Sequence, residues 1–492
     1  MSYSKFSTTL LFYSFIGLIS FGQTIPKQYT LDRVVEIAQV QSPNALLAKN
    51  HFLKSFWEYR TSEARLLPKL NLDAQLPNIQ RQITKQTLGG NDYFFETAQA
   101  NTSAALSLSK NIGLTGGQVF LSSSLQRIDY LDTALTSFLS NPLTIGYQQS
   151  IFTFNPYRWS KKIDPIKYNE AKRKYLEDVE QVSITATIFF FNLLASQIRK
   201  KIAEQKWANY DTLYKIAVGR YNLGKIAEND LLQLELQLLR AESEVETANI
   251  NFEDRMFKLK SYLRLQDDQP IELIPPVEGL DFFEVPIDDA ISKATLNNST
   301  SLSFERRLLE SDREVNRARR TDRFSATLFA QYGLTQSGEQ FGDAYQDPQN
   351  QQQFRLGIHI PILDWGLAKG RIKVAESDRE IIRTSVEQEQ IDFEQNVYLE
   401  VMNFKMQHRQ IEIAAKADTV AQEGYKVSKQ RYMIDRISIT DLNVAQNDKD
   451  NSQIGFIRAL QDYWINYYKL RQLTLFDYKN SREISIDFDK MR

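Results

Sequence analysis

The chain has 492 residues, a formal net charge of -1 at pH 7, no cysteine and three histidines. This charge balance gives no sign of a nucleic-acid partner. The lack of Cys and the scarcity of His exclude thiolate chemistry and a His-rich metal site. No catalytic or phosphate-binding motif stands out either, so we expect no enzymatic activity, no cofactor and no metal.

Residues 1–22 have the pattern of a secretory signal. Lys5 supplies a positive charge, "LLFYSFIGLISF" is apolar, and small residues precede a cut after Gly22. The apolar run is shorter than the ~18 residues that a membrane span needs. We expect no later stretch to span a bilayer as a helix, which leaves a periplasmic, secreted or strand-inserted outer-membrane protein.

The first half of the mature chain, 23–266, predicts a helix followed by strands. Residues 31–65 read as helix, interrupted near Pro43. Apolar and polar residues alternate in "KLNLDAQL", "SAALSLS", "GQVFLSSSL" and "LTIGYQQSIF", which predicts barrel strands within about 66–152. "NIGLTGG" and "TSFLSNP" between them are expected to be loops.

A long helical hairpin is predicted over 157–266. From Trp159 to about Gly219 no glycine occurs, and a helix of that length would span roughly 90 Å. Beyond it, Leu231, Leu234, Leu238 and Ala241 begin a seam of apolar residues with heptad spacing, whose missed position falls at Arg255. Such a seam requires neighbouring helices to pack against.

The second half repeats the first. "RYNLGKIAENDLL" (220–232) and "RYMIDRISITDLN" (431–443) are 211 residues apart, and "GYQQSIFTFNP" aligns with "GIHIPILDWGL" at the same offset. "LPKLNLDAQ" aligns with "FSATLFAQ" at an offset of 256, so the first half carries 256 minus 211, or 45, extra residues. The repeat indicates a duplicated unit.

This duplication sets the remaining boundaries. A Pro- and Gly-containing linker is expected at 267–286, the second repeat at 287–479 and a C-terminal tail at 480–492. Within the second repeat we expect barrel strands at about 323–363 and a long helical hairpin at 365–479.

Four to six strands in one chain cannot close a barrel, which needs about eight. Open sheet edges are not tolerated in lipid. If the strands are membrane strands, identical chains must therefore associate to close the sheet. The predicted fold class is mainly helical with a membrane β-barrel portion: a helical coiled-coil tunnel and a shared barrel, internally duplicated.

The sequence resembles the TolC-like outer-membrane efflux family over essentially the whole mature chain. The resemblance rests on "LPKLNLDAQ", on "QQSIFTFNPYRW" and "IPILDWGLAKGRIKVAES", and on the paired "RYxxGxxxxxDLL"-type turns. It implies a homotrimer with a 12-stranded barrel in outer-membrane lipid and a helical tunnel in the periplasm. It further implies a periplasmic adaptor and an inner-membrane transporter as partners, in tripartite efflux or type I secretion. The cargo and the class of pump are left open.

The resemblance also implies a gate at the two repeated turns. Asp230 is expected to bond Tyr432, and Asp441 to line a ring that constricts the lumen. The family's second acidic position is Val444 here, and its basic gate residue maps to Ile437, with Arg436 adjacent. The expected adaptor contacts at the exposed tip are Asn222, Leu223, Gly224, Lys225, Ile434, Asp435 and Arg436.

The residues alone give a structural interpretation of the same turns. Gly224 suits a helix C-terminus with positive φ, and Asp435 takes its place in the second copy. Ser438 and Asp441 form an S-x-x-D capping box. Capping could therefore explain the aspartates without any gate.

Trp159 and Trp365 each follow a predicted strand. They are expected to lie at the membrane interface, where aromatic residues gather. The alternative is a packed elbow between strand and helix. For the whole chain, the alternative to an outer-membrane duct is a soluble periplasmic coiled-coil scaffold or adaptor without a barrel.

Overall fold

The computed structural model describes residues 27–266, 269–277, 282–434 and 436–491. The signal peptide expected at 1–22 and Asp435 lie outside the described residues, as do parts of the expected linker.

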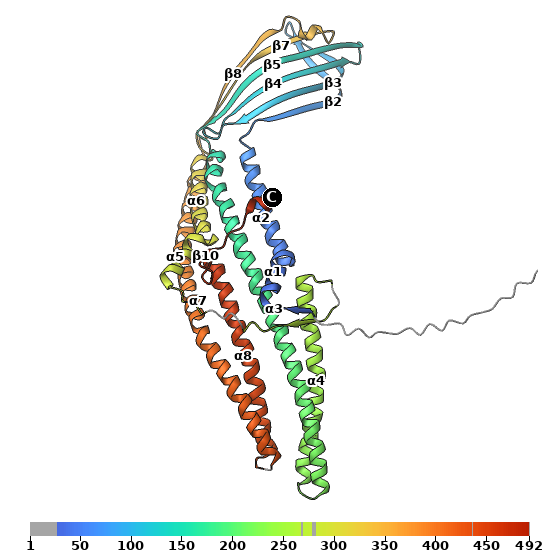
Figure 1. The fold of residues 1–492 in the computed structure, drawn as a ribbon. Coiled ribbons are helices and arrows are strands. Elements are labelled where there is room, and N and C mark those ends of the chain that lie inside the picture. Colours follow the sequence, from blue (N-terminus) through green and yellow to red (C-terminus); the bar gives the residue numbers. More distant parts are fainter. Residues whose placement is uncertain (1–26, 267–268, 278–281, 435, 492) are drawn as a thin grey trace, which may run out of the picture. The chain divides into compact units, whose positions relative to one another are not determined.

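Helices make up most of the described chain (Figure 1). The α-helices are α1 (Leu31–Gln41), α2 (Pro43–Ala64), α3 (Pro156–Asn222), α4 (Glu228–Leu263), α5 (Ile287–Asn297), α6 (Ser299–Arg320), α7 (Leu367–Met433) and α8 (Ile439–Thr474). Two 3₁₀ turns are η1 (Asp343–Tyr345) and η2 (Phe488–Met491).

The interruption expected near Pro43 falls at the junction of α1 and α2. There the Ser42 hydroxyl accepts a hydrogen bond from the Ala45 amide at 3.2 Å. Pro43 takes the first helical position of α2, where its missing N–H costs no hydrogen bond.

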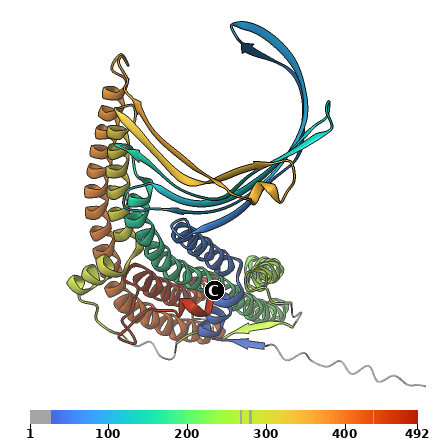
Figure 2. The same cartoon turned by 90° about the horizontal axis from the view of Figure 1, so that it is seen from above.

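Six strands form one antiparallel sheet in the order β2-β3-β4-β5-β7-β8. Figure 2 shows it as an open, curved arc. Its members are β2 (Lys69–Leu88), β3 (Asn91–Asn111), β4 (Gln118–Tyr130), β5 (Leu135–Ile151), β7 (Ser325–Gly338) and β8 (Gln349–His359). Two small pairs are β1 (Lys27–Tyr29) with β6 (Ile271–Leu273), and β9 (Phe476–Asp477) with β10 (Arg482–Glu483).

The described chain forms two compact units. One contains the described parts of Met1–Ala38, Ala186–Leu280 and Ala414–Gln461, which include the turns between the paired long helices. The other contains Gln39–Thr185, the described part of Asp281–Ile413, and the described part of Asp462–Arg492, which include the six-stranded sheet.

The strands account for the 45 extra residues of the first half. Four of the six strands precede α3 and two precede α7. Strand β5 corresponds to β8, because residue 146 aligns with residue 357 at the offset of 211. Strand β2 corresponds to β7, because residue 75 aligns with residue 331 at the offset of 256. The strands without a counterpart in the second half are therefore β3 and β4.

One loop expectation is wrong and one is confirmed. "TSFLSNP" lies inside β5, and its Pro142 falls in the register shift between Ser140 and Thr144, where a missing N–H costs no ladder bond. The turn "IGLTGG" of the added hairpin is a loop, as expected, and it lies beside the helix ends. There the Asn155 side-chain amide donates to the carbonyls of Gly113 and Leu114, both at 3.1 Å.

The expectation that no helix could span a membrane is also wrong by length and composition alone. Helix α3 contains an 18-residue window of mean hydropathy 1.3. More than half of that window, 56%, is buried in the protein, as in the core helix of a bundle. Phe190 and Phe191, for example, are fully buried, so packing accounts for this apolar stretch.

The predicted seam of α4 is buried or half-buried from Leu231 to Tyr262, but not at its missed position. Arg255 is exposed and Met256 is buried in its place. An α-helix drifts by about 20° per heptad, so the buried stripe moves on by one residue.

Candidate gate and membrane sheet

The first repeated turn follows from one glycine. Gly224 has φ of 66°, which L-residues rarely adopt. The Gly224 amide donates to the Tyr221 carbonyl at 2.8 Å and the Lys225 amide to the Arg220 carbonyl at 2.9 Å, which is a Schellman motif ending α3. The prediction of a helix-ending glycine is confirmed.

The second repeated turn uses the same backbone bond and a different cap. The Arg436 amide donates to the Arg431 carbonyl at 2.9 Å, matching Lys225 and Arg220 at the offset of 211. At the start of α8, the Asp441 amide donates to the Ser438 hydroxyl at 3.2 Å, and the Ser438 amide donates to the Asp441 carboxylate at 3.1 Å. The predicted capping box is confirmed.

This cap sets the electrostatics of Asp441. The Ser438 hydroxyl, then the Ser438 amide and the charge of Arg431, hold the pKa of the Asp441 carboxyl below its usual value. Asp230 differs, since the residue before α4 is Ala227, which makes no side-chain cap bond. Capping therefore explains Asp441 but not Asp230.

Asp230 and Tyr432, which the sequence predicts to pair, line one cavity of about 290 Å³. Arg220 lines the same cavity, and its guanidinium donates to the Met433 carbonyl at 2.9 Å. This bond joins the end of α3 to the end of α7. The sequence prediction missed Arg220 as a site residue, although its recurrence as Arg431 in the repeated phrase was a usable signal.

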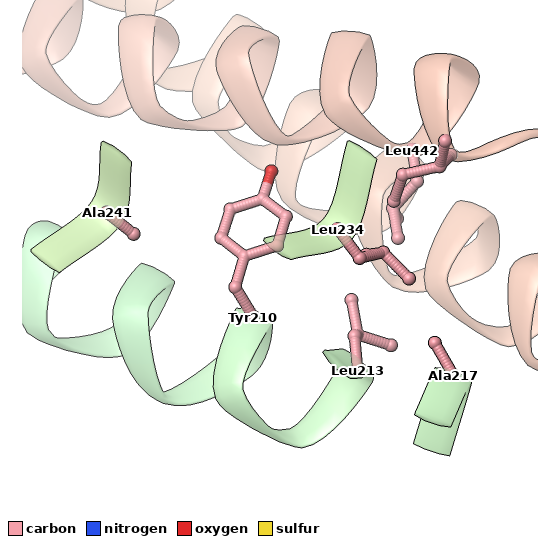
Figure 3. Packing of buried hydrophobic residues seen from close by; sticks show 7 residues of the cluster. Tyr210, Leu213, Ala217, Leu234, Ala241 and Leu442 are labelled. Atoms are coloured by element: carbon pink, nitrogen blue, oxygen red, sulfur yellow. The ribbon is translucent and has the colours of Figure 1, made fainter. Parts of the chain in front are cut away.

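A hydrophobic cluster adjoins this cavity and shares Leu213, Ala217 and Ile439 with its lining. Figure 3 shows the packing of its side chains. The cluster combines side chains of α3, α4 and α8, and Tyr432 and Ile437 pack against it. The Tyr210 hydroxyl donates to the Asn443 side-chain oxygen at 2.5 Å, and burial raises the pKa of Tyr210 to about 12. The buried members are Tyr210, Leu213, Ala217, Leu234, Ala241, Ile439 and Leu442.

The predicted adaptor contacts are available at these turns. Asn222, Leu223, Lys225, Ile434 and Arg436 are all exposed. Leu223 and Ile434 are 72% and 68% exposed.

The six-stranded sheet has one apolar and one polar face. Residues directly opposite one another on paired strands point to the same face. The registers give an almost wholly apolar row across the sheet: Leu70, Leu108, Leu121, Ile145, Tyr332 and Gln352. The adjacent row on the other face is Asn71, Ser107, Ser122, Thr144, Gly333 and Gln351.

The apolar face is not covered by the described chain. Leu70, Leu72 and Ile145 are 65%, 69% and 53% exposed. Alternation of this kind, with bare large apolar side chains on one face, is the pattern of a membrane strand. Farther along β2 and β3 from Leu70, the same face carries charged side chains. There the Arg81 Nε atom lies 3.5 Å from the Glu96 Oε1 atom.

The two candidate interface tryptophans differ in setting. Trp159 is half-buried, with the Lys162 ammonium 5.6 Å from its ring centroid. Trp365 has φ of 52° and is 90% exposed. Trp159 therefore fits the packed elbow, whereas Trp365 is open to its surroundings, as an anchor at a membrane interface would be.

Comparisons with known proteins agree with these features. Residues 294–474 match the model of the outer membrane efflux protein family. Comparison with curated proteins gives no match.

Solved structures resemble the whole fold. The outer membrane channel CmeC of Campylobacter jejuni matches with 16% identity and a TM-score of 0.66 over 94% of this chain and 88% of that one. The open-state channel MtrE of Neisseria gonorrhoeae matches with 14% identity and a TM-score of 0.63 over 93% of this chain and 91% of that one. The outer membrane protein VceC of Vibrio cholerae matches with 11% identity and a TM-score of 0.62 over 92% of this chain and 97% of that one.

The predicted fold class, long helical hairpins combined with a curved antiparallel sheet, is confirmed by the likeness to solved channels. The predicted outer-membrane location agrees with the family match over residues 294–474. The bare apolar face of the sheet favours membrane strands over the alternative of a soluble scaffold or adaptor without a barrel. The family and its neighbours are channel proteins. Residues 294–474 thus match the outer membrane efflux protein family that the sequence resembles, and the fold of the chain is that of solved outer membrane channels.

Proposed function

We propose that three copies of this chain form a passive exit duct, closing one barrel in the outer membrane and one helical tunnel in the periplasm. One observation carries the proposal: the sheet has an apolar face, a polar face and two edges that the described chain does not pair. Unpaired backbone groups in lipid cost several kcal/mol each. Association of identical chains removes that cost and places the polar faces around a water-filled lumen.

The energy for transport comes, in this proposal, from an inner-membrane transporter that a periplasmic adaptor connects to the duct, in tripartite efflux or type I secretion. The turns that end α3 and α7 are the docking points. Exposed Leu223 and Ile434, beside Lys225 and Arg436, supply apolar area and positive charge to the adaptor.

The same turns form the proposed gate. Asp230 and Tyr432, which line the shared cavity, close the gate, and the Arg220 bond to Met433 holds the ends of α3 and α7 together. Asp441, repeated three times around the axis and flanked by Arg436, lines the constriction and attracts cations.

Conductance tests the duct and the gate together. Asp230→Ala combined with Tyr432→Phe should raise single-channel conductance in planar bilayers, because the closing contact is lost. Glu228→Ala is the matched control, since Glu228 lies in the same first turn of α4 but does not line the cavity. Conductance equal to the wild type would contradict the gate, and no conductance from any variant would contradict the duct.

Photo-crosslinking tests the docking points. A crosslinker at Leu223 or Ile434 should capture the adaptor encoded with this chain. Capture only from Val277, in the linker and 47% exposed, would place the adaptor elsewhere.

A further inference from the structure

Both edges of the six-stranded sheet are open. Strand β2 pairs only with β3, and β8 only with β7, within the part of the chain that the structure describes. The free edges offer 20 residues of β2 and 11 of β8. Leu70 and Leu72 on one edge strand and Leu356 and Ile358 on the other belong to the apolar face, so both edges lie at membrane depth.

The directions of the edge strands make them complementary. Strand β2 leaves the helices at Lys69, and β8 returns toward them at His359. The edge strands therefore run in opposite directions, as they must in an antiparallel sheet with an even number of strands. The β8 edge of one copy can continue into the β2 edge of the next without changing the antiparallel pattern.

The added strands β3 and β4 are integral to this sheet. Strand β3 is paired with β2 from Lys69 to Leu88, and with β4 from Asn111 back to Gln99. Strand β4 is paired with β5 along its whole length, from Gln118 to Tyr130. Removing the added hairpin from the barrel wall would break the ladders on both of its sides and expose their backbone groups to lipid.

We propose that β8 of each copy pairs with β2 of its neighbour and that three copies close an 18-stranded barrel. The strand number, three times six, rests on the proposed trimer, whereas the family resemblance implies twelve strands. A ring built from one edge-to-edge contact repeated around an axis leaves no edge exposed.

The larger strand number changes the lumen. Barrel diameter grows roughly linearly with strand number, and barrels of 16–18 strands leave an aqueous channel. The rows of Asn, Ser, Thr and Gln side chains on the polar face would line this channel. The barrel of this chain is therefore expected to be about half as wide again as a 12-stranded barrel of similar tilt.

Engineered disulfides test the edge pairing directly, because the chain contains no cysteine. Gln353→Cys in β8 is combined in turn with Asn71→Cys, Asp73→Cys and Gln75→Cys in β2, all on the polar face. Oxidation in outer membranes should give covalently linked trimers on a denaturing gel for at least one of the three pairs. The paired residues Gln331 and Gln353 in one chain, both changed to Cys, are the control for reactivity.

The opposite result is equally specific. In a second set, Gln353→Cys is combined with Ser122→Cys or Ser124→Cys in β4. If disulfides between chains form only in this set, β2 and β3 lie outside the barrel wall and the 18-strand count is overturned. Electron cryomicroscopy of the trimer gives an independent count, in which twelve strands would overturn the proposal. A trimer that conducts ions but has twelve strands contradicts only this inference, whereas a non-conducting monomer contradicts the proposed duct itself.

Discussion

Single residues decide the ends of the long helices. Gly224 ends α3 because only glycine adopts φ of 66° without strain, and no atom lies within 4 Å of where a Cβ would be. The cost of any substitution there is thus purely conformational. Gly219, five residues earlier inside α3, also has open space around it but has helical backbone.

These two glycines give a matched pair of predictions. Gly224→Ala should destabilise the turn by about 1–2 kcal/mol, because a Cβ is strained in the left-handed region. Gly219→Ala should stabilise α3 locally by about 1 kcal/mol, because alanine has the higher helix propensity. Hydrogen exchange of the amides in 215–232 measures both. Equal effects of the two substitutions would contradict a conformational role for Gly224.

At the scale of elements, the caps distinguish the two hairpins. Helix α8 begins with the Ser438–Asp441 box, whereas α4 begins at Ala227 without a side-chain cap. The pKa of Asp441 is lowered in the folded chain. A lowered carboxyl pKa stabilises the fold above the unfolded pKa, near 4, and this contribution is lost as the pH falls through the lower folded value.

The start of α8 should therefore be better protected at neutral pH than at a pH below the lowered pKa of Asp441. Ser438→Ala should speed hydrogen exchange in its first turn at pH 7, since removal of a Ser N-cap typically costs about 1 kcal/mol. The variant should also flatten the pH dependence. Ser243→Ala, at an exposed position inside α4, is the control. An unchanged pH profile in Ser438→Ala would contradict the cap as its source.

At the scale of the whole molecule, the two faces of the sheet decide where the protein resides. Leu72 and Asp73 are neighbours in β2 that point to opposite faces, because side chains alternate along a strand. A positive charge on the lipid side of a barrel costs about 2–4 kcal/mol at the bilayer midplane. The same charge on the polar side remains in water.

Leu72→Lys should therefore lower the amount of assembled protein in the outer membrane, whereas Asp73→Lys should assemble normally. Quantitative blotting of outer-membrane fractions, with heat stability of the assembly as a second readout, measures the difference. Similar losses in both variants would mean that the sheet does not separate lipid from water in the proposed way.

The sequence by itself determined the duplicated plan, the long hairpins, the alternating strands, the helix-ending Gly224 and the Ser438–Asp441 cap. These features depend on spacing and local backbone chemistry, which a single chain displays directly. The gate pair Asp230 and Tyr432 came from the family resemblance and remains a prediction.

Only the tertiary structure decided the other features. It placed β3 and β4 between β2 and β5, put the "IGLTGG" turn beside the helix ends and brought Arg220 to the Met433 carbonyl. Strand order, the side on which a turn lies, and contacts across about 200 residues depend on pairing between distant segments. Local alternation carries no information about which distant strand will satisfy a given edge.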